Sequence, residues 1–491
     1  MHKAGTTIAK NAGALLGSQL VTWALTLALT LVLPRYVGPS GVGEIQIAQS
    51  IWMVLGVLIA CGMDMLLVKA IARDPARIGS LVGSSFALRG GLFLLSCLAA
   101  ALYLSLHQFP PVITALVVLC GIAQLFNQFA SASSAALQGL EQMGAVSVAT
   151  IVSKVVNTGL GIAVLMLGYG VYGVAFVSIL SVLALFLIQF VALRRTTGLR
   201  LRAGEPPLGL LRAGSPYLFS GLTLALYSQI DVLIISTLVN TTVVGWYSAA
   251  LLLFGTLQFV PVALTTSLFP ALTRSVKSDP ARAAELLRRS FDLMLLVSVP
   301  IGLGLLVVGQ PLMVLLYGPE FAPSGVVLAV LGLVVPMTYL NILLGRFLIA
   351  ADRQVTWTVV MIGATLITVP LDLWLVPLCQ SLYGNGALGG AFSFVIAELG
   401  MTLAGLALLP RGVLGRANAL TALRTVAAGA LMAAACWWFR EMFVAVPVLV
   451  GAAVYSALAL LLRAVPPADL ALARDLARRM FARGWGLGTR G

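Results

Sequence analysis

The sequence predicts an all-α integral membrane protein, and three observations support this fold class. Hydrophobic residues make up 60% of the 491 residues and charged residues only 9%, whereas a soluble protein needs roughly a quarter of its residues charged. The mean hydropathy is +1.04. Apolar stretches of about 20 residues, the length that crosses a bilayer as a helix, recur along the chain. These observations exclude large soluble domains.

The apolar stretches, separated by charged residues and by glycine or proline, predict about 14 transmembrane helices. We place them at residues 13–34, 44–68, 80–104, 112–138, 146–167, 172–193, 214–238, 245–272, 291–316, 324–348, 355–378, 386–409, 419–439 and 443–463. The first stretch lacks a small-residue cleavage site, so we interpret it as a retained span rather than a signal peptide.

The basic residues of the loops predict that both termini are cytoplasmic. On that assumption, alternate loops carry the following basic residues: Lys69, Arg73, Arg77, Arg194, Arg195, Arg200, Arg202, Arg212, Arg274, Lys277, Arg282, Arg288, Arg289, Arg353, Arg411 and Arg416. The opposite loops carry almost only Arg35 and Arg440. This asymmetry follows the positive-inside rule and favours an even number of spans. The net charge of +14 therefore reflects topology, and we expect no nucleic-acid partner.

The sequence nearly repeats itself after about 205 residues, a spacing that the two copies of Asp-Pro-Ala-Arg at 74–77 and 279–282 define. A second pattern, G-x-G-x-x-G-x-A-F, begins at Gly168 and again at Gly384. The repeat predicts two pseudo-symmetric six-helix bundles in the same orientation, which rock around a central cavity. The predicted domains are residues 1–203, residues 204–412, and an extension at 413–491 with two helices and a basic cytoplasmic tail.

Two alternative interpretations attach to these segments. The glycine runs satisfy the dinucleotide-binding pattern, but that motif requires a strand, a turn and a helix, whereas each run here joins two membrane spans. We therefore interpret them as tight turns and close helix packing. In the tail, residues 469–483 place leucines on one face and arginines around the rest, which predicts a helix on the cytoplasmic leaflet; a solvated tail is the alternative.

Polar residues inside the spans mark candidate binding positions. Gln19 begins a polar stripe in the first span, Gln124 and Asn127 lie on one in the fourth, and Tyr227 lies on one in the seventh. Such stripes either line a polar cavity or hold helices together. Arg89 and Lys154 lie about nine residues inside the cytoplasmic edge, roughly 13 Å deep at 1.5 Å per residue. Two buried cations without an evident acidic neighbour suit an anion, although a structural role is the alternative.

Three acidic residues lie in the spans of the second half: Asp231, Asp372 and Glu398. A charge at mid-membrane is expensive, so each is expected to face the bundle interior, a partner or water. Coupling to H⁺ or Na⁺ is the functional interpretation, and an ion pair that locks two spans is the structural one. The five cysteines form no C-x-x-C pair, and only two histidines are present. We therefore expect no metal site, no cofactor and no disulfide framework.

Three motifs carry a resemblance to a known family. Arg35, Gly38 and Gly43 form an R-x-x-G-x-x-x-x-G hairpin after the first span. An Ile-Asp pair at 230–231 precedes Val-Gly-Trp-Tyr-Ser-Ala-Ala at 244–250, and Leu-Asp-Leu-Trp-Leu-Val-Pro occupies 371–377. Together these motifs resemble the polysaccharide flippases of the multidrug/oligosaccharidyl-lipid/polysaccharide exporter superfamily.

The resemblance implies a flippase of the bacterial cytoplasmic (inner) membrane that moves an undecaprenyl-diphosphate-linked oligosaccharide outward by alternating access. The product pathway would be exopolysaccharide, capsule or O-antigen synthesis. Implied partners are the lipid-linked oligosaccharide, membrane lipids and the polysaccharide polymerase machinery. Arg89 and Lys154 would hold the diphosphate, with Gln19, Gln124, Asn127 and Tyr227 around the substrate. The alternatives are a lipid II flippase of peptidoglycan synthesis and a cation-coupled multidrug antiporter. The predicted outer loops are short, so we expect no enzyme.

Overall fold

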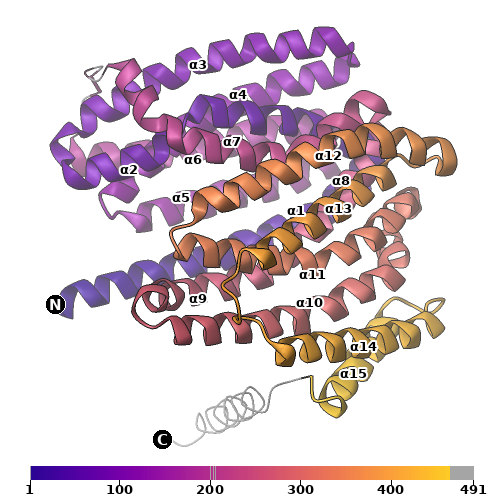
Figure 1. Cartoon of the computed structure of the whole chain (residues 1–491). Helices are drawn as coiled ribbons and strands as arrows, with labels where there is room; N and C mark the ends of the chain where they lie inside the picture. Colours follow the sequence, from indigo (N-terminus) through magenta and orange to yellow (C-terminus); the bar gives the residue numbers. More distant parts are fainter. Residues whose placement is uncertain (1, 199–200, 203, 205, 465–491) are drawn as a thin grey trace, which may run out of the picture. The chain divides into compact units, whose positions relative to one another are not determined.

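The computed structural model describes residues 2–198, 201–202, 204 and 206–464, and their side chains from residue 21 onward except at 207 and 208. All regular elements of this part are helical. The helices are α1 (His2–Ala60), α2 (Met63–Arg73), η1 (Pro75–Arg77), α3 (Ile78–His107), α4 (Pro111–Gly139), α5 (Met143–Met166), α6 (Gly170–Thr197), α7 (Pro207–Leu238), α8 (Thr241–Leu257), α9 (Phe259–Ser278), α10 (Pro280–Tyr317), η2 (Pro319–Phe321), α11 (Ala322–Ala350), α12 (Gln354–Tyr383), α13 (Ala387–Ala407), α14 (Arg416–Trp438) and α15 (Ala445–Leu461) (Figure 1). The predicted surface helix at 469–483 lies outside the described residues.

The number of spans agrees with the prediction once α1 is divided at a break. Twelve helical stretches of the described chain are long and apolar enough to cross a membrane, and α15 is a shorter apolar helix. One of the twelve includes most of α1, in which Gly38 has the non-helical angles φ 67° and ψ 178° between Pro34 and Pro39. At 1.5 Å per residue, α1 would be far longer than the roughly 30 Å hydrocarbon core, so the break separates two crossings. The described chain therefore holds fourteen spans, and the predicted all-α membrane fold is confirmed.

Two predicted spans are interrupted in the structure. The second predicted span, 44–68, breaks at Cys61 and Gly62, which have φ angles of 45° and 67°. The eighth, 245–272, breaks between α8 and α9 at Gln258. Both breaks lie within long apolar stretches whose average hydropathy stays high, even with Gln258 at the second break, which is why the hydropathy pattern did not reveal them.

The repeated sequence motifs adopt similar local structures. Asp74 Oδ1 accepts a hydrogen bond from the amide of Ala76 at 3.2 Å, and Asp279 Oδ1 accepts one from the amide of Arg282 at 3.0 Å. Each aspartate thus satisfies an amide that a helix start leaves free. The two glycine runs form the α5–α6 and α12–α13 turns between helices, which agrees with the interpretation against a dinucleotide site.

The chain divides into two compact units that interleave along the sequence. Unit 1 comprises residues 1–256, 313–327 and 358–397, and unit 2 comprises residues 257–312, 328–357 and 398 onward. The domains predicted at 1–203, 204–412 and 413–491 remain a prediction.

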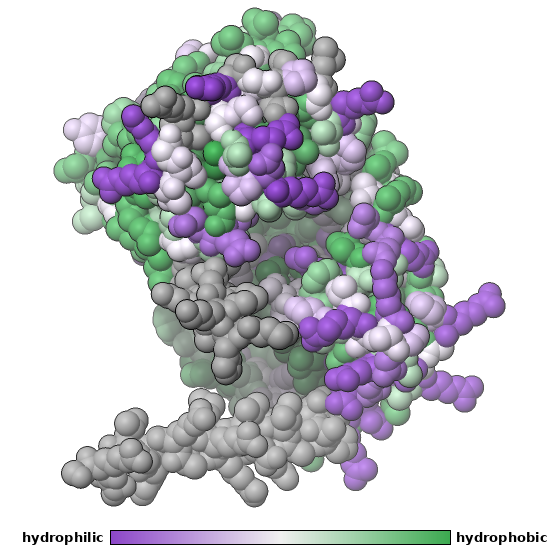
Figure 2. Space-filling view, turned by 90° about the vertical axis from the view of Figure 1, so that its left-hand side faces the viewer, coloured by the Kyte–Doolittle hydropathy of each residue, from purple (hydrophilic) through white to green (hydrophobic). Residues whose placement is uncertain are grey.

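Unit 1 is organised around α1, α4 and α6. Helix α6 packs against α4 and α5, and α1 packs against α4, α5 and α7 (Figure 1). A cluster of buried apolar side chains from α2, α3, α4, α6 and α7 includes Leu67, Val82, Ala136 and Leu193. Figure 2 looks onto the end of this unit where α2 joins α3, and hydrophilic side chains gather there between apolar flanks. The exposed basic residues of the cytoplasmic loop predicted after the second span lie in this connection.

Unit 2 includes α9, α14, α15 and most of α10 and α11. Helices α10 and α11 approach so closely that a Cβ atom on Gly302 or on Gly332 would overlap the carbonyl oxygen of the other glycine. The α14–α15 pair packs on α10, where the hydroxyl of Tyr455 donates a hydrogen bond to the Leu296 carbonyl at 2.7 Å. Small residues at these contacts are what helix packing in lipid requires.

Candidate functional site

A cavity of about 590 Å³ opens within unit 1 between α1, α4, α6 and α7. Its polar wall includes Gln49 on α1, Gln124, Asn127 and Gln128 on α4, and Tyr217 on α7. The volume lies in the range of small-ligand sites, roughly 300–1,000 Å³. None of the residues that line it carries a formal charge. The wall is therefore suited to a neutral ligand that both donates and accepts hydrogen bonds.

The wall follows from helical spacing in α1 and α4. Gln124, Asn127 and Gln128 are separated by three and four residues, so they share one face of α4. On α1, Trp52 and Gly56 share a face for the same reason. A Cβ atom at Gly56 would overlap the amide nitrogen of Gln124, so glycine at this position leaves the space that the amide occupies.

Amide groups in the wall remain available to a ligand. Asn127 Nδ2 donates to Gln124 Oε1 at 3.3 Å, which leaves the Gln124 amide nitrogen and the Asn127 carbonyl oxygen without a hydrogen-bond partner among the described residues. Gln49 is exposed to the cavity and is likewise unengaged within the described chain. Trp52 donates its indole N–H to the Val117 carbonyl at 2.7 Å, which fixes an aromatic ring in the same wall.

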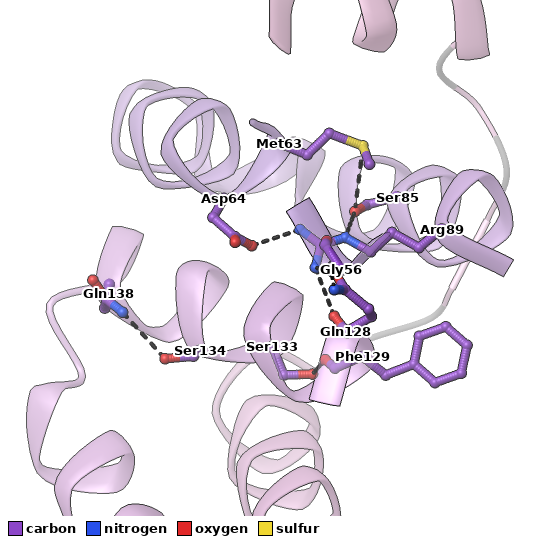
Figure 3. Close-up of polar contacts among 10 residues, drawn as sticks. All are labelled: Gly56, Met63, Asp64, Ser85, Arg89, Gln128, Phe129, Ser133, Ser134 and Gln138. Carbon is purple, nitrogen blue, oxygen red and sulfur yellow. Dashed lines mark hydrogen bonds and ion pairs between the residues drawn. The ribbon is translucent and has the colours of Figure 1, made fainter. Parts of the chain in front are cut away.

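Arg89 lies behind this wall and holds one of its members (Figure 3). Its side chain is 0% exposed; Nε donates to Ser85 Oγ at 3.2 Å, and Nη1 donates to the backbone and side-chain oxygens of Gln128 at 2.7 and 3.1 Å. Nη2 forms an ion pair with Asp64 at 2.5 Å. Gln128 in turn donates to the Gly56 carbonyl at 2.8 Å. The guanidinium thus fixes Gln128 between α3 and α1.

This geometry corrects one premise of the sequence analysis. We expected Arg89 to lack an acidic neighbour, but Asp64 of α2 supplies one. The pair was not predictable because Asp64 and Arg89 lie on different helices, 25 positions apart in the sequence, and its formation depends on how the two helices are rotated. Arg89 is therefore neutralised and enclosed.

Two other predicted substrate residues, Lys154 and Tyr227, are not on the cavity wall. Lys154 on α5 is partly buried, and its ammonium group has no hydrogen-bond or ion-pair partner among the described residues. Tyr227 on α7 packs near Phe394, with ring centroids 6.4 Å apart. The side chain of Gln19 lies outside the described residues. Of the six predicted substrate residues, the cavity brings together Gln124 and Asn127, with Arg89 acting on their neighbour.

A second polar site in unit 1 combines two of the predicted acidic residues. The hydroxyl of Tyr247 on α8 donates to Asp231 Oδ2 on α7 at 2.6 Å. Asp372 on α12 is 0% exposed and lies close enough to Asp231 for the two carboxyl groups to interact. Neither carboxyl oxygen of Asp372 has a hydrogen-bond partner within the described residues. Two adjacent buried carboxyl groups with free oxygens are chemically suited to a proton or a small cation.

Glu398, the third predicted acidic residue, belongs to unit 2 and has its own partners. Asn341 Nδ2 donates to Glu398 Oε2 at 2.7 Å and to its backbone carbonyl at 3.1 Å. Thr402 donates to Asn341 Oδ1 at 3.1 Å. The carboxylate is thus part of a hydrogen-bonded network between α11 and α13.

The sequence analysis did not identify several residues of the cavity and of the carboxyl pair. Gln128 lies one turn beyond Gln124 on the predicted α4 stripe, so that signal was present. Tyr247 lies in the motif at 244–250, but only its partner Asp231 was assigned a role. Gln49 and Trp52 are separated by a single helical turn in the second span, a weak signal. Tyr217 had no sequence signal, because only the packing of α7 against α1 brings it to the cavity.

Fold and sites together define a multi-pass helical membrane protein with a polar cavity and a buried carboxyl pair. Residues 32–325, more than half of the chain, match the family described as "Polysaccharide biosynthesis protein". The chain belongs to this family. A comparison with curated proteins found no match.

Solved structures of the same fold include transporters and a flippase. The chain is similar to "Lipid II flippase MurJ, inward closed conformation", with 14% identity and a TM-score of 0.71 over 93% of this chain and 99% of that one. It is also similar to an inward-facing multidrug resistance MATE family transporter of the MOP superfamily (16% identity, TM-score 0.62, 78% and 94% coverage). The Vibrio cholerae MATE transporter VcmN gives 17% identity and a TM-score of 0.51, with 82% and 98% coverage. The resemblance inferred from the sequence motifs is confirmed.

Proposed function

We propose that the chain is a flippase that moves an undecaprenyl-diphosphate-linked oligosaccharide from the cytoplasmic to the outer leaflet. The observation that carries this proposal is the uncharged, amide-lined cavity inside a membrane-spanning chain of the polysaccharide biosynthesis family. Sugar hydroxyls that leave water need hydrogen-bond partners, and free amide groups both donate and accept. The lipid tail can remain in the hydrocarbon.

The proposed transport uses alternating access and breaks no covalent bond, so the chain is not an enzyme in this proposal. The setting is the bacterial cytoplasmic membrane with both termini in the cytoplasm, which the basic loops support. The lipid-linked oligosaccharide and the surrounding lipids are the proposed partners, and the polymerase machinery is the proposed recipient of the product. Exopolysaccharide, capsule and O-antigen pathways all fit this chemistry.

For the charged part of the substrate, Lys154 is the better supported of the two predicted cations. Lys154 is partly buried and its ammonium group is unpaired among the described residues, whereas Arg89 is enclosed and already paired with Asp64. In this proposal Gln124 and Asn127 contact the glycan, and Arg89 positions Gln128. Gln19 and Tyr227 keep their predicted place along the substrate path.

For energy coupling, we assign H⁺ or Na⁺ binding to the Asp231–Asp372 pair. The free oxygens of Asp372 beside Asp231 support this assignment, because a bound proton or cation would neutralise a charge that the membrane interior disfavours. Glu398 remains a weaker candidate, since Asn341 already donates to its carboxylate.

Mass spectrometry of lipid-linked oligosaccharides tests the proposed function, in cells with and without the gene and with the polymer pathway otherwise intact. We expect an undecaprenyl-diphosphate oligosaccharide to accumulate in the deletion strain, and its mass would identify the glycan. Accumulated lipid II would instead favour the peptidoglycan flippase. No accumulation, together with new sensitivity to cationic drugs, would replace the proposal with the multidrug antiporter.

A further inference from the structure

The cavity wall itself offers no charged group to the diphosphate of the proposed substrate, because neither Lys154 nor any other charged residue lines it. A glycan can be held by amides, but a diphosphate carries negative charge and is best bound by charge-assisted donors. Such a donor must lie at the cavity, because the sugar and the diphosphate are covalently joined. The cations that are hydrogen-bonded to the wall are therefore the groups to compare.

Two cations of the described chain are hydrogen-bonded to side chains of the wall. Arg89 is bonded to Gln128, but it is enclosed and paired with Asp64. Lys69 on α2 is bonded to Tyr217, is exposed, and has no acidic partner among the described residues. Of these two cations, only Lys69 can offer unneutralised positive charge to a ligand at the wall; Lys154 has no acidic partner among the described residues either, but it does not line the cavity.

The position of Lys69 is set by Tyr217 and by the packing beneath it. Lys69 Nζ donates to the Tyr217 hydroxyl at 2.6 Å and lies 5.0 Å from the centre of its ring. An ammonium has three N–H donors, so two remain for phosphate oxygens. Gly62, with φ 67°, packs so tightly on α7 that its Cβ would lie 2.6 Å from Tyr217 Cβ. Packing against the start of α2 thus fixes the position of Tyr217, and the hydrogen bond to Tyr217 fixes the position of Lys69.

The place of Lys69 along α2 agrees with a lipid headgroup. It lies four residues before Arg73, at the helix end that the positive-inside rule assigns to the cytoplasm. A lipid diphosphate resides at the headgroup level while its tail stays in the bilayer. A sugar in the cavity and a diphosphate at the rim would then be bound together.

We propose that Lys69, held by Tyr217, binds the diphosphate of the lipid-linked glycan at the rim of the cavity. This inference rests on the proposed function. It gives a substrate-binding role to Lys69, which the sequence analysis counted only as a basic residue of a cytoplasmic loop. It assigns the glycan to the uncharged wall and the anion to the rim. Tyr217 is the link, because it contacts both.

Binding of two polyprenyl lipids to the purified full chain tests the inference. The chain is placed in phosphatidylcholine nanodiscs, and its affinities for undecaprenyl diphosphate and for undecaprenol are measured by native mass spectrometry. Phosphatidylglycerol is measured in the same way as a second phosphate-bearing lipid. Lys69→Gln removes the charge, Lys69→Arg restores it, and Tyr217→Phe removes only the acceptor. Lys277→Gln is the matched control, an exposed lysine of unit 2 paired with Asp352.

We expect Lys69→Gln to weaken diphosphate binding about ten-fold or more, the loss typical of one charge-assisted hydrogen bond, and to leave undecaprenol binding unchanged. Lys69→Arg should retain most of the affinity, Tyr217→Phe should lose about three-fold, and Lys277→Gln should match the wild type. Equal diphosphate affinity in Lys69→Gln and the wild type would overturn the inference. So would an equal ten-fold loss for phosphatidylglycerol, which would make Lys69 a general lipid-phosphate contact.

The same measurement separates this inference from the proposed function. Wild-type chain that binds the diphosphate lipid no better than undecaprenol would remove support for the flippase substrate itself, and the Lys69 assignment with it. Tight wild-type binding that is insensitive to Lys69→Gln would defeat the Lys69 assignment alone. A normal elution profile and melting temperature of Lys69→Gln, expected for an exposed side chain, establish that the variant is folded.

Discussion

Arg89 is the largest fully enclosed side chain of the structure, and its partners are a carboxylate and an amide of the cavity wall. Only the arginine of this ion pair is fully buried, since the Asp64 side chain is 42% exposed. Removing Arg89 therefore leaves the buried oxygens of Gln128 without a donor, whereas water can solvate the aspartate. We therefore expect this residue to affect stability and, through Gln128, the shape of the binding site.

We expect Arg89→Met to lower the free energy of unfolding by about 2–3 kcal/mol, because Asp64 and Gln128 lose their donor. The double variant Arg89→Met/Asp64→Leu should regain only the part of this loss that comes from the aspartate, because the Gln128 oxygens still lack their donor. Thermal unfolding in detergent measures both. A single variant as stable as the wild type would show that the ion pair contributes little. Export that stays lost in a stable double variant would show that the guanidinium is needed to position Gln128 in the binding site and not for stability alone.

Gly56 offers a more local test of the cavity. Gly56→Ala places a methyl group where the Gln124 amide lies, so the flexible glutamine must move while the backbone keeps its course. We expect lipid-linked oligosaccharide to accumulate at an unchanged protein level, as measured by mass spectrometry and immunoblotting. Gly159→Ala is the matched control, since a Cβ there meets open space. Equal export by the two variants would argue against the cavity as the substrate site.

How much of the site could be predicted depends on whether a signal lies within one helix. Gln124 and Asn127 were predictable because one helix carries both on one face. The Arg89–Asp64 and Asp231–Asp372 contacts join different helices, and the sequence does not record how each helix is rotated about its axis. The sequence analysis assigned Lys69 to a cytoplasmic loop by the positive-inside rule and gave it no other role. Only the structure shows that it is hydrogen-bonded to Tyr217 of the cavity wall.

At the level of elements, hydropathy predicted the number of spans and failed at their interruptions. A break at Cys61–Gly62 changes the backbone without changing the apolar character of the sequence. The break has a consequence for the site, because Gly62 both lines the cavity and contacts α7. Residues 1–203, 204–412 and 413–491 were predicted as domains from the repeat alone, and that division stays a prediction.

The α10–α11 crossing gives a prediction at this scale. A Cβ at Gly302 would overlap the backbone of α11, and backbone atoms cannot relieve the overlap by changing rotamer as a side chain can. We expect Gly302→Ala to force the helices apart and to cost about 1–3 kcal/mol of stability. Gly304→Ala, on the same helix but facing open space, should leave the melting temperature nearly unchanged. Equal melting temperatures for the two variants would contradict the close crossing.

For the whole molecule, the carboxyl pair predicts how transport depends on an ion gradient. We expect Asp231→Asn and Asp372→Asn to transport at a rate that no longer rises with the H⁺ or Na⁺ gradient, because the charge that the ion neutralises is gone. Substrate uptake into proteoliposomes with imposed gradients measures this. Glu398→Gln, which keeps a partner for Asn341, should retain most of the gradient response. Unchanged gradient dependence in both aspartate variants would remove the pair from coupling.

The ion pair of Arg89 and Asp64 also has an electrical consequence. Moving one unit charge through the membrane potential takes about 2.3 kcal/mol per 100 mV. Because the two opposite charges are in contact and their helices belong to one unit, a movement of that unit carries no net gating charge from them. Any voltage sensitivity of the transport cycle must then come from groups whose charge is not cancelled within the fold. Among the sites described above, those groups are the Asp231–Asp372 pair and two lysines, Lys69 and Lys154, which have no acidic partner among the described residues.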